Sequence, residues 1–216
     1  MSLTRKLFVI AFTAVAALWN GQSQAHVPYF EHQDFSEDSP FVVKNNIDQS
    51  IAVYAWLETD GENPTKDVDV YRFEINEPAR IYAELLVPVC PAYQDFVPWF
   101  LLAGPGLPVP EMDLPFEIPE GAGVIVMENV VPGSERKTFY EPFGAKSYYN
   151  GPVLDQVVEA PGVYYLYFWD PHQTGGDYVG VLGWKEIWTP RDIARALFYT
   201  PRIRQDKELH TDCTPD

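Results

Sequence analysis

Histidine is the residue type in this chain best suited to hold a transition metal, and one histidine has a special position. Cleavage after Ser23-Gln24-Ala25, which fits a signal-peptidase site, would leave His26 as the first residue of the mature chain. Its amine and its ring, with the ring of a second histidine, form a three-nitrogen set that suits Cu(II). We therefore predict a copper site at His26, with His172 as the first candidate for the second ring and His32 as the next. The alternative is that His26 begins a lead segment with a free terminus.

Two carboxylates offer the hard oxygen ligands that calcium prefers. Asp67 and Asp69 are two positions apart, so in a strand both side chains point to the same face. With loop oxygens from residues 60–63, they form a candidate calcium site. In the alternative interpretation Asp67 ends a turn and Asp69 accepts hydrogen bonds from local backbone amides. The absence of a twelve-residue calcium loop from the sequence favours this alternative.

No residues stand out as catalytic. The Gly-x-Ser-x-Gly, His-Glu-x-x-His and phosphate-loop signatures do not occur in the sequence. Aromatic residues make up 15% of the chain, and they either fill the core or, where exposed, stack on sugar rings. We therefore predict a binding module that is not an enzyme, with a metal ion, a carbohydrate or an extracytoplasmic protein as its ligand. A copper carrier or oxidase is the alternative.

The start of the chain is typical of an export signal. Arg5 and Lys6 precede an apolar run from Leu7 to Leu18, which at 12 residues is well short of the roughly 20 that span a bilayer. We expect residues 1–25 to be removed and the protein to be periplasmic or secreted, with no membrane span.

The positions of the two cysteines are consistent with export. Cys90 and Cys213 both lie in the exported part, and an oxidising compartment favours pairing them. The predicted disulfide ties the C-terminus to the middle of the chain. Two unrelated thiols are the competing interpretation.

The charge of the chain restricts its partners. Without the signal there are 13 basic and 31 acidic residues, a net charge of −18. Such a surface repels phosphates, so nucleic acid is excluded as a partner. The acidity serves solubility or the binding of cations.

Short runs rich in β-branched and aromatic residues recur between glycines and prolines, which predicts an all-β fold. The sequence suggests an antiparallel β-sandwich over residues 26–187, in one domain. The expected strands are Ser50–Leu57, Asp69–Ile75, Ala79–Val87, Trp99–Ala103, Gly123–Val130, Thr138–Phe143, Val153–Val158, Gly162–Trp169 and Tyr178–Gly183.

Prolines cluster over residues 88–119, and because proline cannot donate to a sheet we expect a long loop over the sandwich there. This loop either carries function or covers the end of a sheet.

Residues 188–216 are predicted to form one helix and a tail. Thr189 is a suitable N-cap and Asp192 completes its capping box, while Thr200-Pro201 should end the helix. The helix carries an apolar stripe that we expect to dock on the core: Ile193, Ala194, Leu197 and Phe198.

Three segments resemble a known family. Asp67–Phe73 (DVDVYRF), Ala160–Leu166 (APGVYYL) and Gly176–Gly183 (GDYVGVLG) are similar to strands of the pre-peptidase C-terminal domain family, over about residues 50–186. The resemblance implies a jelly-roll β-sandwich that acts as a binding module.

Overall fold

The computed structural model describes residues 26–44, 46–59 and 67–213. The predicted signal at residues 1–25 and the loop oxygens of residues 60–63 lie outside these ranges. In chain order the elements are β1 (Val27–Phe30), β2 (Phe41–Val42), β3 (Ile51–Leu57), β4 (Val68–Ile75), β5 (Ala79–Pro88), η1 (Pro91–Tyr93), β6 (Trp99–Gly104), β7 (Gly123–Met127), β8 (Thr138–Glu141), β9 (Lys146–Val158), β10 (Gly162–Trp169), β11 (Gly176–Leu182) and α2 (Pro190–Ile203).

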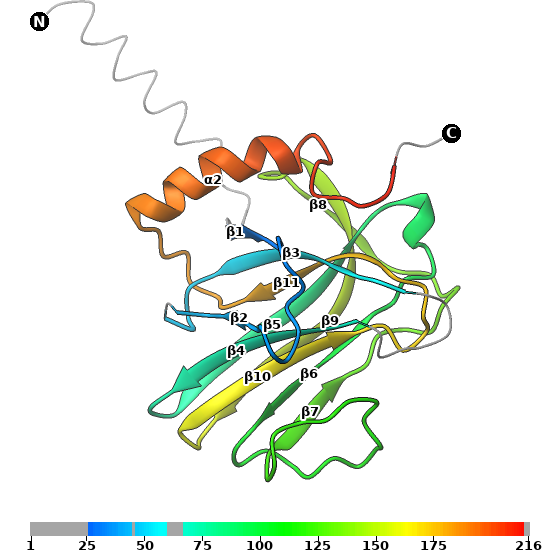
Figure 1. Ribbon diagram of the computed structural model, residues 1–216. Helices are drawn as coiled ribbons and strands as arrows, with labels where there is room; N and C mark the ends of the chain where they lie inside the picture. Colours follow the sequence, from blue (N-terminus) through cyan, green and yellow to red (C-terminus); the bar gives the residue numbers. More distant parts are fainter. Residues whose placement is uncertain (1–25, 45, 60–66, 214–216) are drawn as a thin grey trace, which may run out of the picture.

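The strands form two sheets packed face to face, which confirms the predicted β-sandwich (Figure 1). One sheet has the order β1-β3-β11-β5-β9-β8 and the other β2-β4-β10-β6-β7. All pairs are antiparallel except β1 with β3 and β2 with β4. The short strands β1 and β2 were not expected from the sequence, and β9 begins at Lys146, seven residues before the predicted start at Val153.

The core lies between the two sheets, and β10 is central to its sheet. Tyr164, Leu166 and Phe168 point into this core, while Tyr167 and Trp169 pack on the opposite side. Side chains therefore cover β10 on both of its faces.

The proline-rich segment is not one continuous loop, because η1 and β6 interrupt it. Its later part lies over the outer face of the five-stranded sheet. There Leu114, Phe116 and Ile118 pack on the cluster around Tyr167 and Trp169. This part of the segment acts as a cover for β10.

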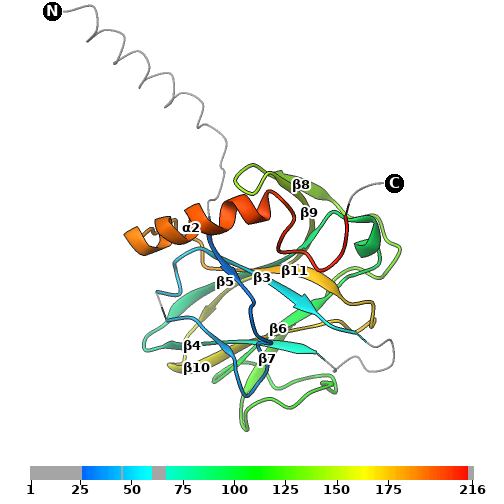
Figure 2. The same ribbon diagram turned by 45° about the horizontal axis from the view of Figure 1, so that its top comes forward.

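The outer face of the six-stranded sheet has two separate covers. At one end lies α2, which runs across β1 in both views (Figures 1 and 2). At the other end lies the C-terminal tail. There the buried carboxylate of Asp177 accepts hydrogen bonds from the Tyr93 hydroxyl and the His210 backbone N–H. The His210 ring lies 2.6 Å from the same carboxylate and stacks on Trp56.

The tail is held by the predicted disulfide. Cys90 and Cys213 are bonded, with Cα atoms 4.9 Å apart, within the usual range for a disulfide. Among the described residues there are no other cysteines.

The helix α2 differs from its prediction in two respects. Its capping box of Thr189 and Asp192 is present, but Pro201 lies inside the helix, which continues to Ile203. The apolar stripe does not dock on the core: Ile193, Leu197 and Phe198 are 51%, 75% and 57% exposed. The helix instead packs on the sandwich through a different face, which contains the buried residues Asp192, Ala196 and Ile203. Within the described residues, no helix has the length and apolar character needed to cross a membrane.

Candidate functional site

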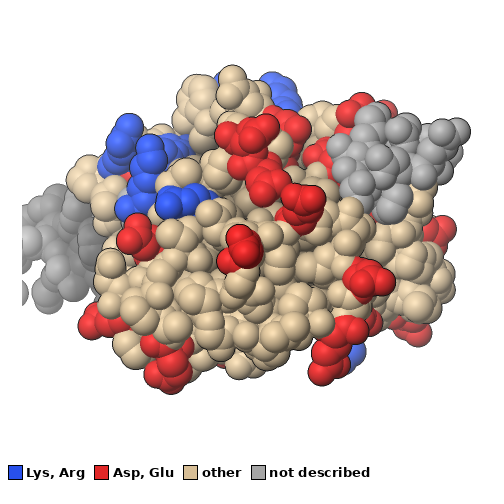
Figure 3. All heavy atoms as spheres, turned by 60° about the horizontal axis from the view of Figure 1, so that its bottom comes forward, with Lys and Arg blue, Asp and Glu red and all other residues tan. Residues whose placement is uncertain are grey.

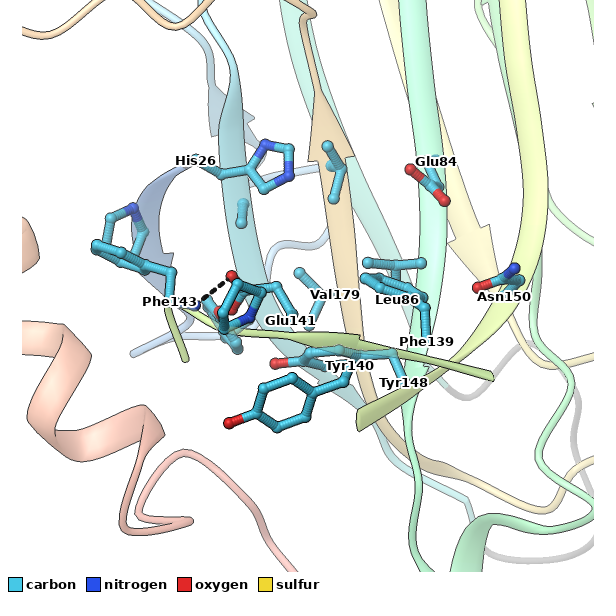
Figure 4. Close-up of a pocket in the computed structure, with 15 residues that line it drawn as sticks. His26, Glu84, Leu86, Phe139, Tyr140, Glu141, Phe143, Tyr148, Asn150 and Val179 are labelled. Atoms are coloured by element: carbon cyan, nitrogen blue, oxygen red, sulfur yellow. Dashed lines mark hydrogen bonds between the residues drawn. The ribbon is translucent and has the colours of Figure 1, made fainter. Parts of the chain in front are cut away.

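A pocket of about 310 Å³ opens on the outer face of the six-stranded sheet, between the two covers (Figure 4). Its apolar floor comes from β3, β11 and β5 and consists of Ala52, Val179, Val181 and Leu86. One wall is residues 139–143, which form β8 and the start of the turn after it. His26, directly before β1, stands at the opposite side.

The sequence builds this floor through the two-residue periodicity of strands. Val179 and Val181 alternate on β11 with inward-pointing Tyr178 and Leu182. Val181 pairs with Ala52 on one side and with Glu84 on the other. Side chains that are far apart in the chain therefore lie side by side across the middle of the sheet.

Glu141 is fixed at the wall by the turn that follows it. Its two carboxylate oxygens accept hydrogen bonds from the backbone N–H groups of Phe143, at 2.6 Å, and Gly144, at 2.5 Å. Burial raises the pKa of Glu141, and the two backbone donors oppose this rise. A Cβ at Gly144 would lie 2.9 Å from the Ile203 side chain, so glycine allows the turn to approach α2 closely.

Glu84 projects from β5 on the floor side of the pocket. The Tyr82 hydroxyl donates to its carboxylate at 3.1 Å. Burial raises the pKa of Glu84, with the Tyr82 hydrogen bond acting in the opposite direction. A partly desolvated carboxylate of this kind binds a cation or a hydrogen-bond donor strongly once ionised.

The His26 ring is held by Ser50, whose Oγ lies 2.5 Å from Nδ1. Burial lowers the pKa of the ring to about 4, so the imidazole is neutral at neutral pH. In that form the ring can accept a hydrogen bond or bind a metal ion.

Tyr54 and Tyr148 also line the pocket, and burial raises the pKa of both hydroxyls. They therefore stay protonated at neutral pH. None of the residues lining the pocket is Lys or Arg. The pocket thus offers carboxylates, hydroxyls and aromatic surface to a ligand, and its charged groups are acidic.

The structure does not bring the three predicted copper ligands together. His172 is in the loop before β11, whereas His26 lies beside Ser50, near the other end of that strand. At roughly 3.3 Å per residue, a strand of this length separates the two by about 20 Å. His32 follows β1 at the end away from His26, and its Nε2 lies 2.9 Å from the Tyr199 hydroxyl. A three-nitrogen site made of these histidines therefore has no geometric support.

The predicted calcium ligands occupy two different environments. Asp69 is fully buried between the sheets, where the Tyr178 hydroxyl donates to its Oδ2 at 2.6 Å. Asp67 lies just before β4, and its Oδ2 accepts the Glu58 backbone N–H at 2.6 Å. Asp69 shares its site with two carboxylates that the sequence did not single out, Glu31 and Asp34, with ligand atoms of all three within 4.8 Å of one another.

Within this acidic cluster, Glu31 accepts hydrogen bonds from the backbone of Phe35 and Trp56. Burial raises the pKa of Glu31 to about 7. The pKa of Asp69 is also raised, mainly by burial and secondly by repulsion from the Glu31 carboxylate. The Oδ1 atom of Asp69 is buried and has no hydrogen-bond partner in the described part of the chain. An apolar core rarely leaves such an oxygen without a partner, so the cluster is suited to bind a proton or a cation.

Sequence reasoning missed Glu84, Glu141 and Glu31, although Glu84 and Glu31 each had a local signal. Glu84 is the one charged residue in the apolar run from Ile81 to Val87. Glu31 ends an apolar run that starts at Val27. Charged residues in such runs indicate a site more often than charges on polar segments do.

No protein-family model matches the chain, and no curated protein matches its sequence. Among solved structures, the chain is similar to the pre-peptidase C-terminal domain of a collagenase from Bacillus anthracis, a crystal structure. The similarity covers 74% of this chain and 96% of that domain, at 12% sequence identity and a TM-score of 0.32.

The acidic cluster predicts a pH-dependent stability. Because folding raises the pKa of Glu31 from 4.5 to about 7, its contribution to stability is present below pH 4.5 and is lost as the pH rises through 7. Glu31→Gln removes this titration. Relative to the wild type, the variant should therefore gain about 2 kcal/mol in free energy of unfolding between pH 5 and pH 8. Urea denaturation at both pH values, with chelator present, measures this difference.

The matched control is Glu74→Gln, at an exposed position on β4. Its stability relative to the wild type should not change with pH. A Glu31→Gln variant that behaves in the same way would contradict the shared burial of Glu31 and Asp69.

Proposed function

We propose that the protein is an exported binding module, not an enzyme, and that its pocket takes a small ligand that is neutral or cationic and rich in hydrogen-bond donors. The observation that carries this proposal is the composition of the pocket. Two partly desolvated carboxylates stand over an apolar floor beside aromatic side chains, and none of the described residues that line the pocket is Lys or Arg.

The size of the pocket limits the ligand. Pockets for small molecules measure roughly 300–1,000 Å³, and this one is at the lower end of that range. A single sugar ring or an amine of similar size is the class that suits it. Tyr140, which is 61% exposed, offers a ring face at the rim for stacking.

The disulfide and the acidic composition support export. We propose the periplasm or the extracellular medium as the site of function.

The pocket should discriminate ligands by charge. Glucosamine, glucose and glucuronate share one ring and differ in charge, so they test the electrostatics without changing the shape greatly. We expect glucosamine to bind most tightly and glucuronate not to bind, because Glu84 and Glu141 attract a cation and repel an anion. Isothermal titration calorimetry with the chain from His26 onward measures the three affinities.

Glu84→Gln should weaken glucosamine binding about tenfold, the effect of losing one charge-assisted hydrogen bond, and should affect glucose less. Glu74→Gln, on the other sheet, is the control and should leave all three affinities unchanged. Binding of glucuronate as tight as that of glucosamine would rule out the proposed selectivity.

Copper binding through His26 is the alternative function. The observation in its favour is the neutral, partly buried His26 ring in a pocket that also holds Glu84 and Glu141. After removal of residues 1–25, the amine and ring of His26 would form a chelate, and the pocket oxygens, not His172 or His32, would complete it.

A comparison of N-termini tests this alternative. The chain beginning at His26 should bind Cu(II) at least tenfold more tightly than the same chain with one added alanine, because the added residue blocks the chelating amine. Competition titration against a chromogenic chelator gives both constants. Equal affinities would exclude copper chelation by the terminus, and the glucosamine titration would be unaffected by that result.

We also propose that calcium stabilises the module by binding Glu31, Asp34 and Asp69. Support comes from the buried Asp69 oxygen without a partner and from the short distances among the three carboxylates. Carboxylate oxygens are the ligands that Ca²⁺ prefers. Asp67, close enough to raise the pKa of Glu31, would add negative charge around the ion.

Calcium at 5 mM and pH 8 should raise the melting temperature of the wild type by about 5 °C, because an ion that binds only the folded state stabilises it. Asp34→Asn, at an exposed ligand, should abolish the rise, whereas Asp38→Asn, at an exposed position nearby, should preserve it. Differential scanning calorimetry measures all three. A wild-type melting temperature that is the same with calcium and with chelator would exclude the site.

A further inference from the structure

The helix α2 exposes an apolar surface that the sandwich does not use. Ile193, Leu197 and Phe198 are 51%, 75% and 57% exposed. At 100° per residue, they lie on the outward side and one flank of the helix. Most large apolar side chains on a soluble protein are buried at least in part, so a row of three along one helix indicates an interaction surface.

Other side chains of α2 make the polar and ring contacts that dock the helix on the sandwich. The Tyr199 ring stacks on Phe30, with ring centroids 4.3 Å apart, and the Arg195 guanidinium lies over the Tyr29 ring. The Asp192 carboxylate accepts a hydrogen bond from the Gln49 side chain at 3.0 Å. These contacts hold the helix in place, and the exposed row is free for a second role.

An apolar groove continues the exposed row toward the β8–β9 turn. Its volume is about 510 Å³, and it is lined by Phe143, Trp188, Ile193, Ala196, Leu197, Thr200, Pro201, Arg204 and Gln205. Arg204, one of the lining residues, donates from Nε to the Phe143 carbonyl at 2.9 Å. The groove is thus open, apolar and bordered by a fixed positive charge.

Basic residues gather on the same segment. Residues 188–207 contain five of the thirteen basic residues found after position 25, against two acidic ones. Arg191, Arg195 and Arg202 lie on the flank of α2 opposite to Leu197, and Arg202 packs over the Phe198 ring. The rest of the chain is strongly acidic, and acidic side chains are spread over the face shown in Figure 3.

We infer that α2 binds the surface of an anionic phospholipid membrane, with its exposed apolar row in the acyl boundary and with Arg191 and Arg202 at the headgroups. An apolar stripe bordered by basic residues along one helix is the pattern of interfacial amphipathic helices. The arginines provide the charge complementarity that the acidic remainder of the protein lacks.

A second copy of the chain fits this surface less well. In a two-fold contact through α2, the same arginines of both copies would face each other, because such an interface pairs a patch with itself. Anionic headgroups instead neutralise all of them. The groove beside Leu197 gives the lipid acyl chains additional apolar area.

Vesicle flotation tests the inference on the chain from His26 onward, which contains every strand and helix described above. The vesicles are pure phosphatidylcholine, or phosphatidylcholine with about a third of phosphatidylglycerol. We expect binding to the anionic vesicles at low salt, a decrease on raising the salt concentration, and at least tenfold weaker partitioning into the neutral vesicles.

Two variants separate the apolar and the charge contributions. Leu197→Ser with Phe198→Ser should weaken partitioning about tenfold or more, and Arg191→Gln with Arg202→Gln should weaken it roughly fivefold per arginine. Val109→Ser with Val131→Ser is the control, because these side chains are 82% and 68% exposed far from α2 in the sequence and should not affect binding. All substituted positions except Arg202 are exposed, and melting curves confirm that each variant is folded.

Three outcomes would overturn the inference. The first is equal partitioning into anionic and neutral vesicles, and the second is no loss in the Leu197/Phe198 variant. The third is a wild-type dimer, seen by light scattering, that the Leu197/Phe198 variant abolishes while vesicle binding is absent. That result would assign the surface to a second copy of the chain.

Discussion

The structure depends on the burial of two strands, β10 and β11, on both of their faces. Apart from Asp177 on β11, the residues of each strand are apolar, aromatic or small on both sides, and each strand lies in the interior of its own sheet. Packing the sheets together covers only the inner faces. Each sheet therefore requires a second layer on its outside. Loops, the helix α2 and the C-terminal tail form these layers.

The two outer layers differ in a way that creates the pocket. Over β10 the proline-rich segment supplies Leu114, Phe116 and Ile118 and forms a satellite core. Over β11 the cover comes from separate pieces, α2 at one end and the disulfide-bonded tail at the other. The β8–β9 hairpin forms a wall of the space between them. The pocket with Glu84 and Glu141 is the part of the outer face that these pieces leave open.

A close approach and a set of buried polar groups fix how the two sheets lie against each other. A Cβ on Gly180 would lie 2.9 Å from the Tyr71 ring, so only glycine allows β11 to approach β4 at this point. The Tyr71 and Tyr178 hydroxyls are 3.1 Å apart, and Tyr178 donates to Asp69. At the corner between β10 and β11, the Asp170 carboxylate accepts hydrogen bonds from the backbone N–H groups of His172, Thr174 and Gly175. These hydrogen bonds fix the loop that carries His172. This structural role of the loop explains why His172 is not available to a distant site.

The sequence by itself determined the fold class, most of the strands and the N-cap of α2 at Thr189, and it predicted the disulfide while leaving two unrelated thiols as the alternative. The strands and the helix start depend on the two-residue periodicity and on local capping, both of which can be read along the chain. The tertiary structure alone decided which side chains share a site. His26 lines a pocket with Glu84 and lies far from His172, Asp69 clusters with Glu31 and Asp34, and Leu197 faces solvent although its spacing suggested a core contact. The physical reason is that strand order and the placement of the covers arise from contacts between distant segments, which no local pattern encodes.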